Sequence, residues 1–487
     1  MRRDLLILFF ILLSSALMAD EHTNEAPSFK VQGIVTDEKG EGLPGASVWV
    51  KGTVVGAGTN AKGEFSFKLS SKNKCVLRVS FTGYEPQERE VTPGVDSLYR
   101  FVLAPSNNAL NEVVITGTRT LKPLKDVPVL TRVISSEDIA QVNPLDLQSL
   151  LEYEMPGLQF GLAHGSGLPE LKFQGSAGGY VLFMIDGERV AGEGSSNNID
   201  YSLIDMDNVE RIEIVKGPMS TLYGSQAMGG VVNIITKDAN RPFTGNVSVR
   251  YGNNDESKYS LSLGTKQGRF SALTSLSYRK RDAYAVKDKE GQIEYSYYKD
   301  IYGRDSVVAD TSEKGMSSVN GFEIWQANQK LSYTFNENFR ISLNGTYYNN
   351  DVLEYVEQKE QDRFSNYSIN PRVYYAINDS HILDFSYVFE NYEKRYVYTT
   401  SLPSKKIFGD LTNTVRLNYT GYIHEKHTLT AGIEVNTQKL QHYWFDNGSG
   451  KKFDAQTYVL YLQEDYKVSD SFSVLAGVRS DCHSKYG

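Results

Sequence analysis

The chain has few cysteines and no marked excess of charge. Cys75 and Cys482 are the only two cysteines among 487 residues. They fall in regions that we expect to form separate domains, so we expect no disulfide framework, although export would bring the chain into an oxidising compartment. The formal net charge is −8, and no block of like charge stands out. We therefore expect no nucleic-acid partner.

Long apolar runs are missing beyond the N-terminus. Leu5–Leu13 follows Met1-Arg2-Arg3 and precedes small residues that end at Ala19. This apolar stretch of about 15 residues is shorter than the roughly 20 that a helix needs to cross hydrocarbon. Residues 1–19 therefore match a cleaved export signal better than a short membrane anchor. Residence in a membrane would have to depend on β-strands.

Catalytic and metal-binding patterns are missing too. Ser225 lies in Gly224-Ser225-Gln226 without the G-x-S-x-G context of a nucleophile elbow, and no His-Asp pair can be assigned to it. One long polar stretch contains five aspartates that could bind Ca²⁺, although solvated carboxylates are the simpler interpretation: Asp282, Asp288, Asp300, Asp305 and Asp310. We expect no enzyme, no cofactor and no resident metal.

Residues 29–104 alternate short strand-like runs with Gly-rich turns. Runs such as Val31–Val35, Ala46–Val50 and Gly63–Phe67 recur at about ten-residue spacing, which predicts a small β-sandwich. The sequence GIVTDEKGEGLPGASVWVKGT within this region resembles the carboxypeptidase-regulatory-like domain. The resemblance implies a periplasmic spacer or docking module. No zinc-ligand spacing supports a peptidase.

The most informative stretch is residues 210–237, ERIEIVKGPMSTLYGSQAMGGVVNIITK. Two apolar runs, Ile212–Val215 and Val231–Ile235, flank a segment rich in glycine, which predicts two strands joined by tight turns. A Gly-turn-strand unit of a soluble α/β domain is the general alternative. The stretch resembles the end of the plug domain of TonB-dependent outer-membrane receptors. We assign the plug to residues 122–238, with helices after Ser135 and over Pro144–Leu151.

A short β-forming segment, residues 110–118, lies between the two domains. It follows the polar residues Ser106-Asn107-Asn108 and resembles the TonB box of such receptors in sequence and position. An extended segment of this kind can add as a strand to the sheet edge of a partner. We expect the partner contacts from Glu112, Val113, Val114, Ile115 and Thr116. A terminal strand of either neighbouring domain is the alternative.

After Gly245 polar and apolar residues alternate with a period of two. Val247/Val249/Tyr251, Leu383/Phe385/Tyr387/Phe389 and Phe472/Val474/Ala476/Val478 are examples, and most of the 32 tyrosines lie here. Such segments are typical of a transmembrane β-barrel with aromatic girdles, although a soluble β-sandwich also alternates. Tight joins such as Lys266–Gly268 alternate with long polar ones, as periplasmic turns alternate with extracellular loops.

The number of strands is too small for a closed barrel around the plug. We count about eleven, and a barrel has a backbone radius of about 1 Å per strand, hence about 11 Å. A plug of about 117 residues has an outer radius of about 17 Å, so about 22 strands are needed. The expected fold is mainly β: an N-terminal β-sandwich, an α/β plug domain and the first half, residues 243–487, of a transmembrane antiparallel β-barrel. We expect a sequence fragment or a truncated gene product. A half-barrel that dimerises is the alternative.

The resemblance also implies where binding sites lie. Plug apices would contact the ligand through small polar side chains: His164, Ser166, Ser195, Ser196, Asn197 and Asn198. Charges that pair the plug with the barrel wall are expected at Arg211 and Glu213, with Glu464 as a candidate partner, although a bare surface pair is equally simple.

The function implied is energy-coupled import of a large, scarce nutrient across the outer membrane. The partners would be a TonB–ExbB–ExbD type inner-membrane complex, outer-membrane lipids, an iron-chelate, haem or corrinoid ligand, and a surface lipoprotein as an open possibility. An oligosaccharide or peptide importer of the SusC type is the alternative, but such plugs tend to have Lys-Asp-Ala where this chain has Lys216-Gly217-Pro218. A third possible function is that of a non-transporting relic or an adhesin, built on a damaged receptor gene.

Overall fold

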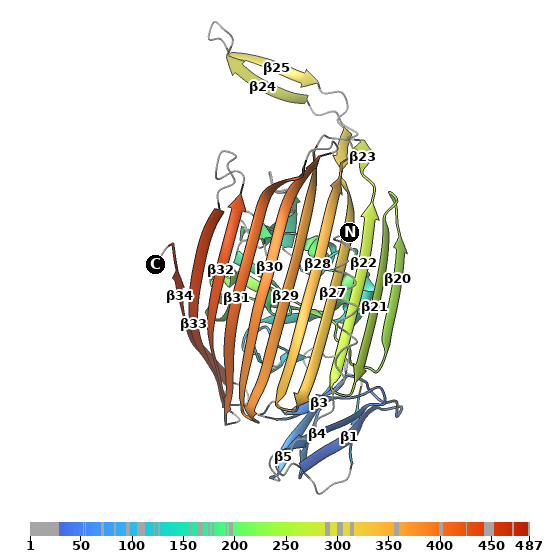
Figure 1. Ribbon diagram of the computed structural model, residues 1–487, viewed down its shortest axis with the longest axis vertical. Helices are drawn as coiled ribbons and strands as arrows, with labels where there is room; N and C mark the ends of the chain where they lie inside the picture. Colours follow the sequence, from blue (N-terminus) through green and yellow to red (C-terminus); the bar gives the residue numbers. More distant parts are fainter. Residues whose placement is uncertain are drawn as a thin grey trace.

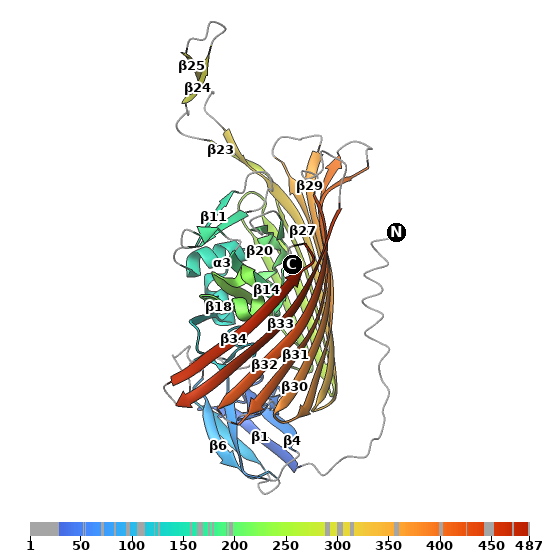
Figure 2. The same ribbon diagram turned by 90° about the vertical axis from the view of Figure 1, so that its left-hand side faces the viewer.

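The computed structural model arranges the chain in three bodies (Figure 1). A wide sheet curves into an open half-cylinder, a mixed α/β domain lies against its concave face, and a small β-body lies at one end (Figure 2). The structure describes residues 29–485 apart from 52, 54, 70–72, 82–83, 94–97, 105–112, 121, 125–126, 156–157, 163–168, 174–175, 178–179, 191, 194–197, 288–292, 300–304, 312–315, 355–359, 399–402, 425, 443–451 and 470–471.

The small β-body has two sheets, as its alternating runs predict. One sheet has the order β4-β1-β7 and the other β3-β2-β5-β6. Apolar residues of both sheets form one buried core, in which Phe65 and Phe101 lie 6.2 Å apart. The strands are β1 (Phe29–Asp37), β2 (Ser47–Val50), β3 (Gly56–Gly58), β4 (Glu64–Leu69), β5 (Cys75–Ser80), β6 (Gln87–Val91) and β7 (Tyr99–Leu103).

The plug is built on a five-stranded sheet with the order β10-β18-β19-β14-β15. In this sheet β14 and β19 are parallel and the other neighbours are antiparallel. Its elements, with a two-stranded hairpin of β8 and β9 that precedes them, are β8 (Val113–Val114), β9 (Lys122–Pro123), β10 (Thr131–Ile134), α2 (Ser136–Val142), α3 (Leu147–Glu154), β11 (Leu158–Leu162), β12 (Pro169–Phe173), β13 (Ser176–Ala177), β14 (Val181–Ile185), β15 (Glu188–Arg189), β16 (Gly192–Glu193), β17 (Asn198–Ile199), η5 (Tyr201–Leu203), η6 (Met206–Asn208), β18 (Val209–Lys216), α4 (Ser220–Tyr223), η7 (Ser225–Ala227) and β19 (Gly230–Thr236).

The informative stretch forms the central hairpin of the plug, β18 and β19, as predicted. Gly217 and Gly230 have φ of 115° and 148°, in the region that favours glycine. At Gly230 a Cβ would lie 2.6 Å from the carbonyl oxygen of Val215, so the two strands can meet here only over a glycine. Ile212 and Ile234 are fully buried in the core of the domain.

Two capped helices pack on this sheet. α2 begins after Ser135, as predicted, and the Ser135 hydroxyl accepts from the Asp138 backbone N–H in a capping box. α3 begins at Leu147 rather than at the predicted Pro144. The reason is Asp146, whose carboxylate accepts from the Ser149 N–H at 2.9 Å and so fixes the first turn.

The half-cylinder is one antiparallel sheet of eleven strands in chain order, which confirms the count from the sequence. The strands are β20 (Thr244–Tyr251), β21 (Ser257–Gln267), β22 (Phe270–Arg281), β27 (Gly321–Asn336), β28 (Phe339–Leu353), β29 (Glu360–Asn378), β30 (His381–Tyr398), β31 (Lys405–Ile423), β32 (His427–His442), β33 (Lys452–Ser469) and β34 (Phe472–His483).

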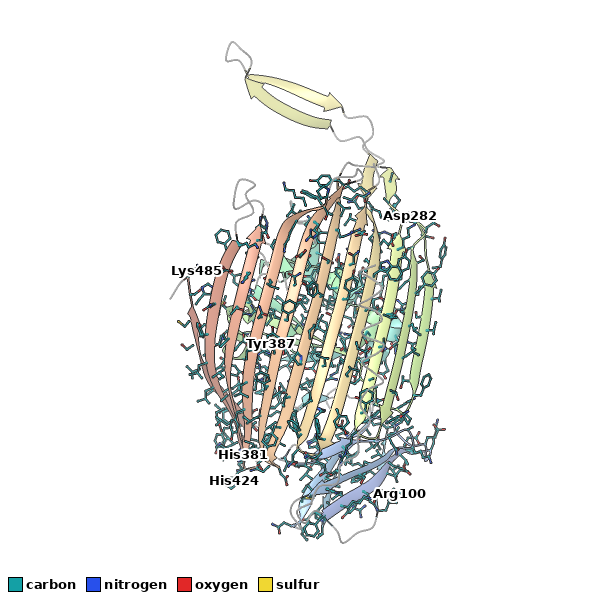
Figure 3. All side chains as sticks on the ribbon, in the orientation of Figure 1. Arg100, Asp282, His381, Tyr387, His424 and Lys485 are labelled. Carbon is teal, nitrogen blue, oxygen red and sulfur yellow. The ribbon has the colours of Figure 1, made fainter. Side chains whose placement is uncertain are left out.

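The two ends of the half-cylinder differ. Turns of two or three residues join the strands at the end near the sandwich, where His381 and His424 lie, and longer connections join them at the end near Asp282 (Figure 3). The sandwich contacts the first end, because the Lys68 N–H donates to the Glu337 carboxylate in the β27–β28 turn at 2.6 Å. The longest polar connection contains further strands that the sequence did not predict: β23 (Tyr284–Lys287), β24 (Ile293–Lys299), β25 (Asp305–Thr311) and β26 (Met316–Val319).

The faces of the sheet follow the predicted alternation. On β29 Tyr367 and Ile369 are 45% and 46% exposed on the convex face, whereas Asn366 is buried towards the plug. Aromatic contacts cluster near both ends, at Tyr278–Trp325 and at Phe335–Phe339, as the girdles of a membrane barrel do.

No helix in the part of the chain that the structure describes is long and apolar enough to span a membrane. Both cysteines are free, one in the sandwich and one in β34, as expected from their separation in the sequence.

Candidate functional site: the coupling hairpin and the plug–wall interface

The segment that resembles a TonB box forms a hairpin on the plug. Val113 and Val114 of β8 pair with Pro123 and Lys122 of β9. Val114 is 1% exposed and Thr116 is fully buried. Glu112 lies outside the described residues. We call residues 113–123 the coupling hairpin.

A single buried carboxylate, Glu213 on β18, holds the hairpin. One of its oxygens, Oε2, accepts from the backbone N–H groups of Ile115 and Thr116 at 2.9 and 2.8 Å and from the Thr116 hydroxyl at 2.6 Å. The other oxygen accepts from the Arg211 guanidinium at 2.8 and 2.9 Å. Because the Glu213 side chain is fully buried, these bonds are not screened by water, and hydrogen bonds to a charged group are the strong ones.

Thr116 is tied to the plug at its other polar atoms as well. Its hydroxyl accepts from the Asn233 amide at 2.9 Å, and its carbonyl accepts from the Tyr223 hydroxyl at 3.0 Å. Burial raises the pKa of Tyr223 to about 12 against the opposing effect of Arg119, so the phenol stays protonated and can donate. Thr116 is therefore a docking residue with every polar atom engaged.

The same hairpin reaches the barrel wall. Arg119 donates to the Leu222 carbonyl at 2.9 Å and to the hydroxyl of Tyr461 on β33. Its guanidinium stacks between the rings of Tyr223 and Tyr461, at 4.6 and 4.9 Å from their centroids. Lys122 forms an ion pair with Asp465, also on β33. The coupling hairpin thus connects the plug core to one strand of the wall.

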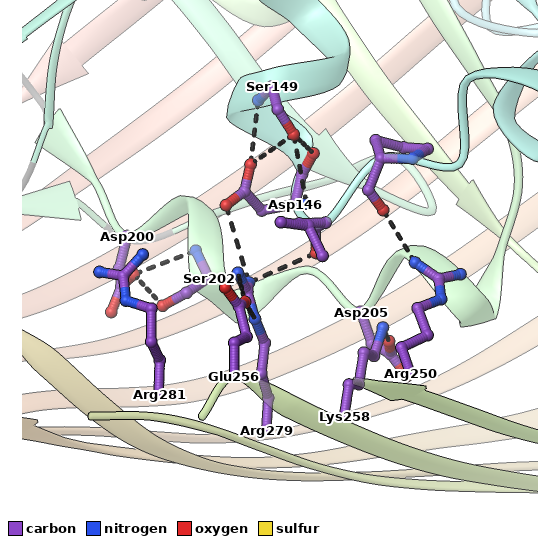
Figure 4. A network of polar contacts seen from close by, with 12 residues as sticks. Asp146, Ser149, Asp200, Ser202, Asp205, Arg250, Glu256, Lys258, Arg279 and Arg281 are labelled. Carbon is purple, nitrogen blue, oxygen red and sulfur yellow. Dashed lines mark hydrogen bonds and ion pairs between the residues drawn. The ribbon is translucent and has the colours of Figure 1, made fainter. Parts of the chain in front are cut away.

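On the opposite side of the plug a carboxylate cluster binds the first strands of the wall (Figure 4). Lys258 of β21 contacts Asp205 and Asp207 at 2.7 and 2.8 Å, and Arg250 of β20 contacts Asp207 at 2.8 Å. Burial raises the pKa of Asp207, but Lys258, a hydrogen bond from Ser260 and Arg250 together lower it below its usual value. The carboxylate is therefore held ionised.

Further ion pairs attach the β14–β15 turn of the plug. Arg416 of β31 bridges Glu188 of the plug and Glu434 of β32, at 2.9 and 2.8 Å. Lys330 of β27 contacts Asp186 at 3.2 Å and Asp238 at 3.1 Å. All these cations face the concave side, so the plug is held from several directions.

The structure places the expected site residues in different surroundings. Arg211 and Glu213 lie two positions apart on β18 and pair with each other inside the plug. Glu464 lies on the convex face of β33 and pairs with His427 at 2.7 Å. Its neighbour Asp465 faces inward, because successive strand residues point to opposite faces. Of the expected plug apices, His164, Ser166 and 195–197 lie outside the described residues, as does the side chain of Asn198 in β17.

Sequence reasoning missed the wall cations Lys258, Arg250 and Arg416. A signal for them is present in the alternation itself. Tyr259 and Leu261 face outward, so Lys258, next to Tyr259 on the strand, faces inward. A charge on an inward position needs a partner on the plug. The same parity applies to Arg416 beside Val415.

No cluster of metal-binding side chains occurs among the described residues. Of the five loop aspartates, Asp282 has a described side chain, and it pairs with Lys280 at 3.0 Å. The side chains of Asp288, Asp300, Asp305 and Asp310 lie outside the described residues.

Family models match two parts of the chain. Residues 123–231 match the TonB-dependent receptor plug domain, and residues 31–115 match the CarboxypepD_reg-like domain. These matches correspond to the plug and the sandwich.

Relatives and a solved structure agree with these matches. The chain is 27% identical over 384 residues to the vitamin B12 transporter BtuB of Vibrio vulnificus, covering 77% of this chain and 58% of the transporter. It is 29% identical over 268 residues to the TonB-dependent receptor SusC of Bacteroides thetaiotaomicron, covering 53% of this chain and 25% of that receptor. The chain therefore spans only part of the length of both relatives.

A structure of the ferric enterobactin receptor PfeA of Pseudomonas aeruginosa superposes with a TM-score of 0.57 at 19% identity, covering 72% of this chain and 57% of that one. This likeness shows the fold: a plug within an antiparallel wall. The plug match and the two relatives show that the chain is similar to TonB-dependent receptors over the plug and beyond it.

Proposed function

We propose that this chain serves energy-coupled import of a large, scarce nutrient, through high-affinity binding and rearrangement of the plug. The observation that supports this best is the coupling hairpin. Glu213 holds the backbone of Ile115 and Thr116 while Arg119 and Lys122 contact the wall. A pull on residues 112–116 would therefore act on the plug core and on its contact with β33 together.

We assign the energy input to an inner-membrane complex of the TonB–ExbB–ExbD type. In the hairpin one edge of β8 already pairs with β9, so a partner strand has to displace β9 or pair with the other edge of β8. This assignment implies that residues 110–118 and the sandwich at 29–104 face the periplasm and that residues 243–487 sit among outer-membrane lipids. The aromatic clusters near both ends of the sheet support the lipid contact.

For the ligand we propose an iron chelate, haem or a corrinoid. One relative, similar over 77% of this chain, is a vitamin B12 transporter, and the turn Lys216-Gly217-Pro218 departs from the Lys-Asp-Ala expected of SusC-type plugs. The plug apices from His164 to Ser166 and from Ser195 to Asn198 remain the proposed contacts, and a surface lipoprotein is a candidate co-receptor.

A second candidate is an oligosaccharide or peptide importer of the SusC type. The match to SusC itself and the sandwich ahead of the plug favour it. A receptor that no longer transports is the third candidate. None of the three is an enzyme, in keeping with the transporters and receptors among its relatives.

Deletion of the gene in its native host separates these candidates. Growth is measured on limiting cobalamin, on limiting iron supplied as a siderophore chelate or haem, and on oligosaccharides as the sole carbon source. We expect a defect on cobalamin or iron that a plasmid copy corrects. A defect restricted to a glycan would favour the SusC-type importer, and normal growth on every source would favour a receptor without transport.

A further inference from the structure

A cavity of about 110 Å³ lies between the plug and the middle of the wall. The plug contributes apolar residues such as Val190 and Ile204, and the wall contributes amides and hydroxyls from β27, β28 and β29. Since one water molecule needs about 10–15 Å³ of such a cavity, the space holds several waters. The wall side is formed by Asn328, Thr346, Asn366, Ser368 and Asn370.

This cavity coincides with a gap in the attachment of the plug. Wall side chains from β20, β21, β27, β31 and β33 form ion pairs with the plug. The described side chains of β29 bond instead to neighbouring strands. Ser368 bonds to Thr346 at 2.6 Å, Asn366 to Glu390 at 2.9 Å, and Arg372 to Asp384 at 2.6 Å. The plug can therefore part from β29 without breaking an ion pair at that strand.

Three amide oxygens on this wall have no protein partner among the described residues: those of Asn328, Asn366 and Asn370. The amide nitrogens of Asn328 and Asn366 already donate to Asn344 and Glu390, which fixes their orientation. A buried acceptor without a donor is costly, so these oxygens favour a molecule that brings O–H or N–H groups.

The acidic groups in the cavity lining are already engaged. Glu188 pairs with Arg416, Asp205 with Lys258, and Glu390 accepts from Asn366. The acceptors left for a passing molecule are therefore neutral amides.

We propose that the inward face of β29 is the wall of the passage along which the ligand moves past the plug, and that it binds hydroxyl and amide N–H groups of the ligand. This proposal rests on the import function proposed above. It assigns the passage to one strand and gives the chemistry of its lining.

The register of the sheet supplies a matched pair of positions for a test. Ser262, Ser275, Asn328, Thr346 and Ser368 lie in one row across five strands. Ser262 and Ser368 are both half-buried serines on the inward face. Ser262 lies beside Asp205 and Asp207 over a space of about 10 Å³, whereas Ser368 lines the large cavity.

Ser262→Cys and Ser368→Cys are made in a full-length gene that also has Cys75→Ser and Cys482→Ser, and cells of the native host are treated with N-ethylmaleimide. We expect Ser368→Cys to be labelled at least tenfold faster than Ser262→Cys. Equal rates, or faster labelling at Ser262→Cys, would overturn the passage. Folding is checked by the amount of each variant in the outer membrane and its resistance to added protease.

Two further comparisons separate this proposal from the import function. If the plug is energised, a protonophore should slow labelling at Ser368→Cys but not at Ser262→Cys. If the protonophore leaves the tenfold difference in labelling rate between the two positions unchanged, the passage stands but energy coupling of the plug is contradicted. A sugar-bearing maleimide should label Ser368→Cys several-fold faster than a cyclohexyl maleimide, and Asn370→Leu should remove this preference. Equal rates with the two reagents would refute the assigned chemistry.

Discussion

Glu213 offers the sharpest test of the coupling hairpin. Glu213→Ala removes the acceptor of three donors in the hairpin and of the Arg211 guanidinium. Loss of one partner from a buried charged network costs about 3–5 kcal/mol. Since 1.36 kcal/mol corresponds to a factor of ten, opening of the hairpin should become roughly 150- to 5,000-fold more frequent.

The opening is measured by thiol labelling at Val114→Cys, in the background that lacks the two native cysteines. Val114 is buried, so its thiol should react only when the hairpin opens, and Glu213→Ala should raise the labelling rate by the same roughly 150- to 5,000-fold. Glu210→Ala is the control, because Glu210 lies on the same strand with a half-exposed side chain and a looser contact to Arg211 at 3.8 Å. Equal protection of Val114→Cys in the parent and in Glu213→Ala would refute the role of Glu213.

Three further substitutions test the plug and its attachment to the wall by thermal unfolding of the purified protein in detergent. Gly230→Ala should destabilise it by about 1–3 kcal/mol because its Cβ would meet the Val215 carbonyl, whereas Gly58→Ala, with open space around it, should not. Arg416→Ala leaves Glu188 and Glu434 without their shared cation and should cost about 3–5 kcal/mol; an unchanged Tm would contradict the buried bridge. The pKa of Asp207 is lowered on folding, so its stabilisation is complete above the unfolded-state pKa and is lost as pH falls through the lower folded value. The Tm of the parent should therefore hold steady above about pH 5 and fall as the pH drops through and below about 4, and Asp207→Asn should start lower and fall less.

The sequence predicts elements where local chemistry decides the outcome. The glycines and apolar runs of residues 210–237 specify two strands and a tight turn, and the Ser135 cap sets the start of α2. The eleven strands could be counted because each face of the sheet meets a single environment along its length. Polar and apolar residues therefore alternate along each strand with a period of two.

Contacts between distant segments could not be predicted in the same way. Glu464 and Asp465 differ by one position, and only the face of the strand decides which of them meets the plug. Thr116 looks like an ordinary strand residue until the fold brings Glu213, Asn233 and Tyr223 around it. The helix expected at Pro144 starts later, because the first turn depends on which side chain caps it.

Energy coupling through the hairpin is tested most directly by separating binding from uptake in Val114→Pro. Proline removes the backbone N–H that a partner strand needs, while Val114→Ala keeps it. Binding and uptake of the radiolabelled nutrient identified by gene deletion are measured in cells with equal outer-membrane amounts of each variant. The coupling hypothesis predicts parental binding with uptake lost in Val114→Pro and kept in Val114→Ala. Uptake by Val114→Pro at the parental rate would contradict it.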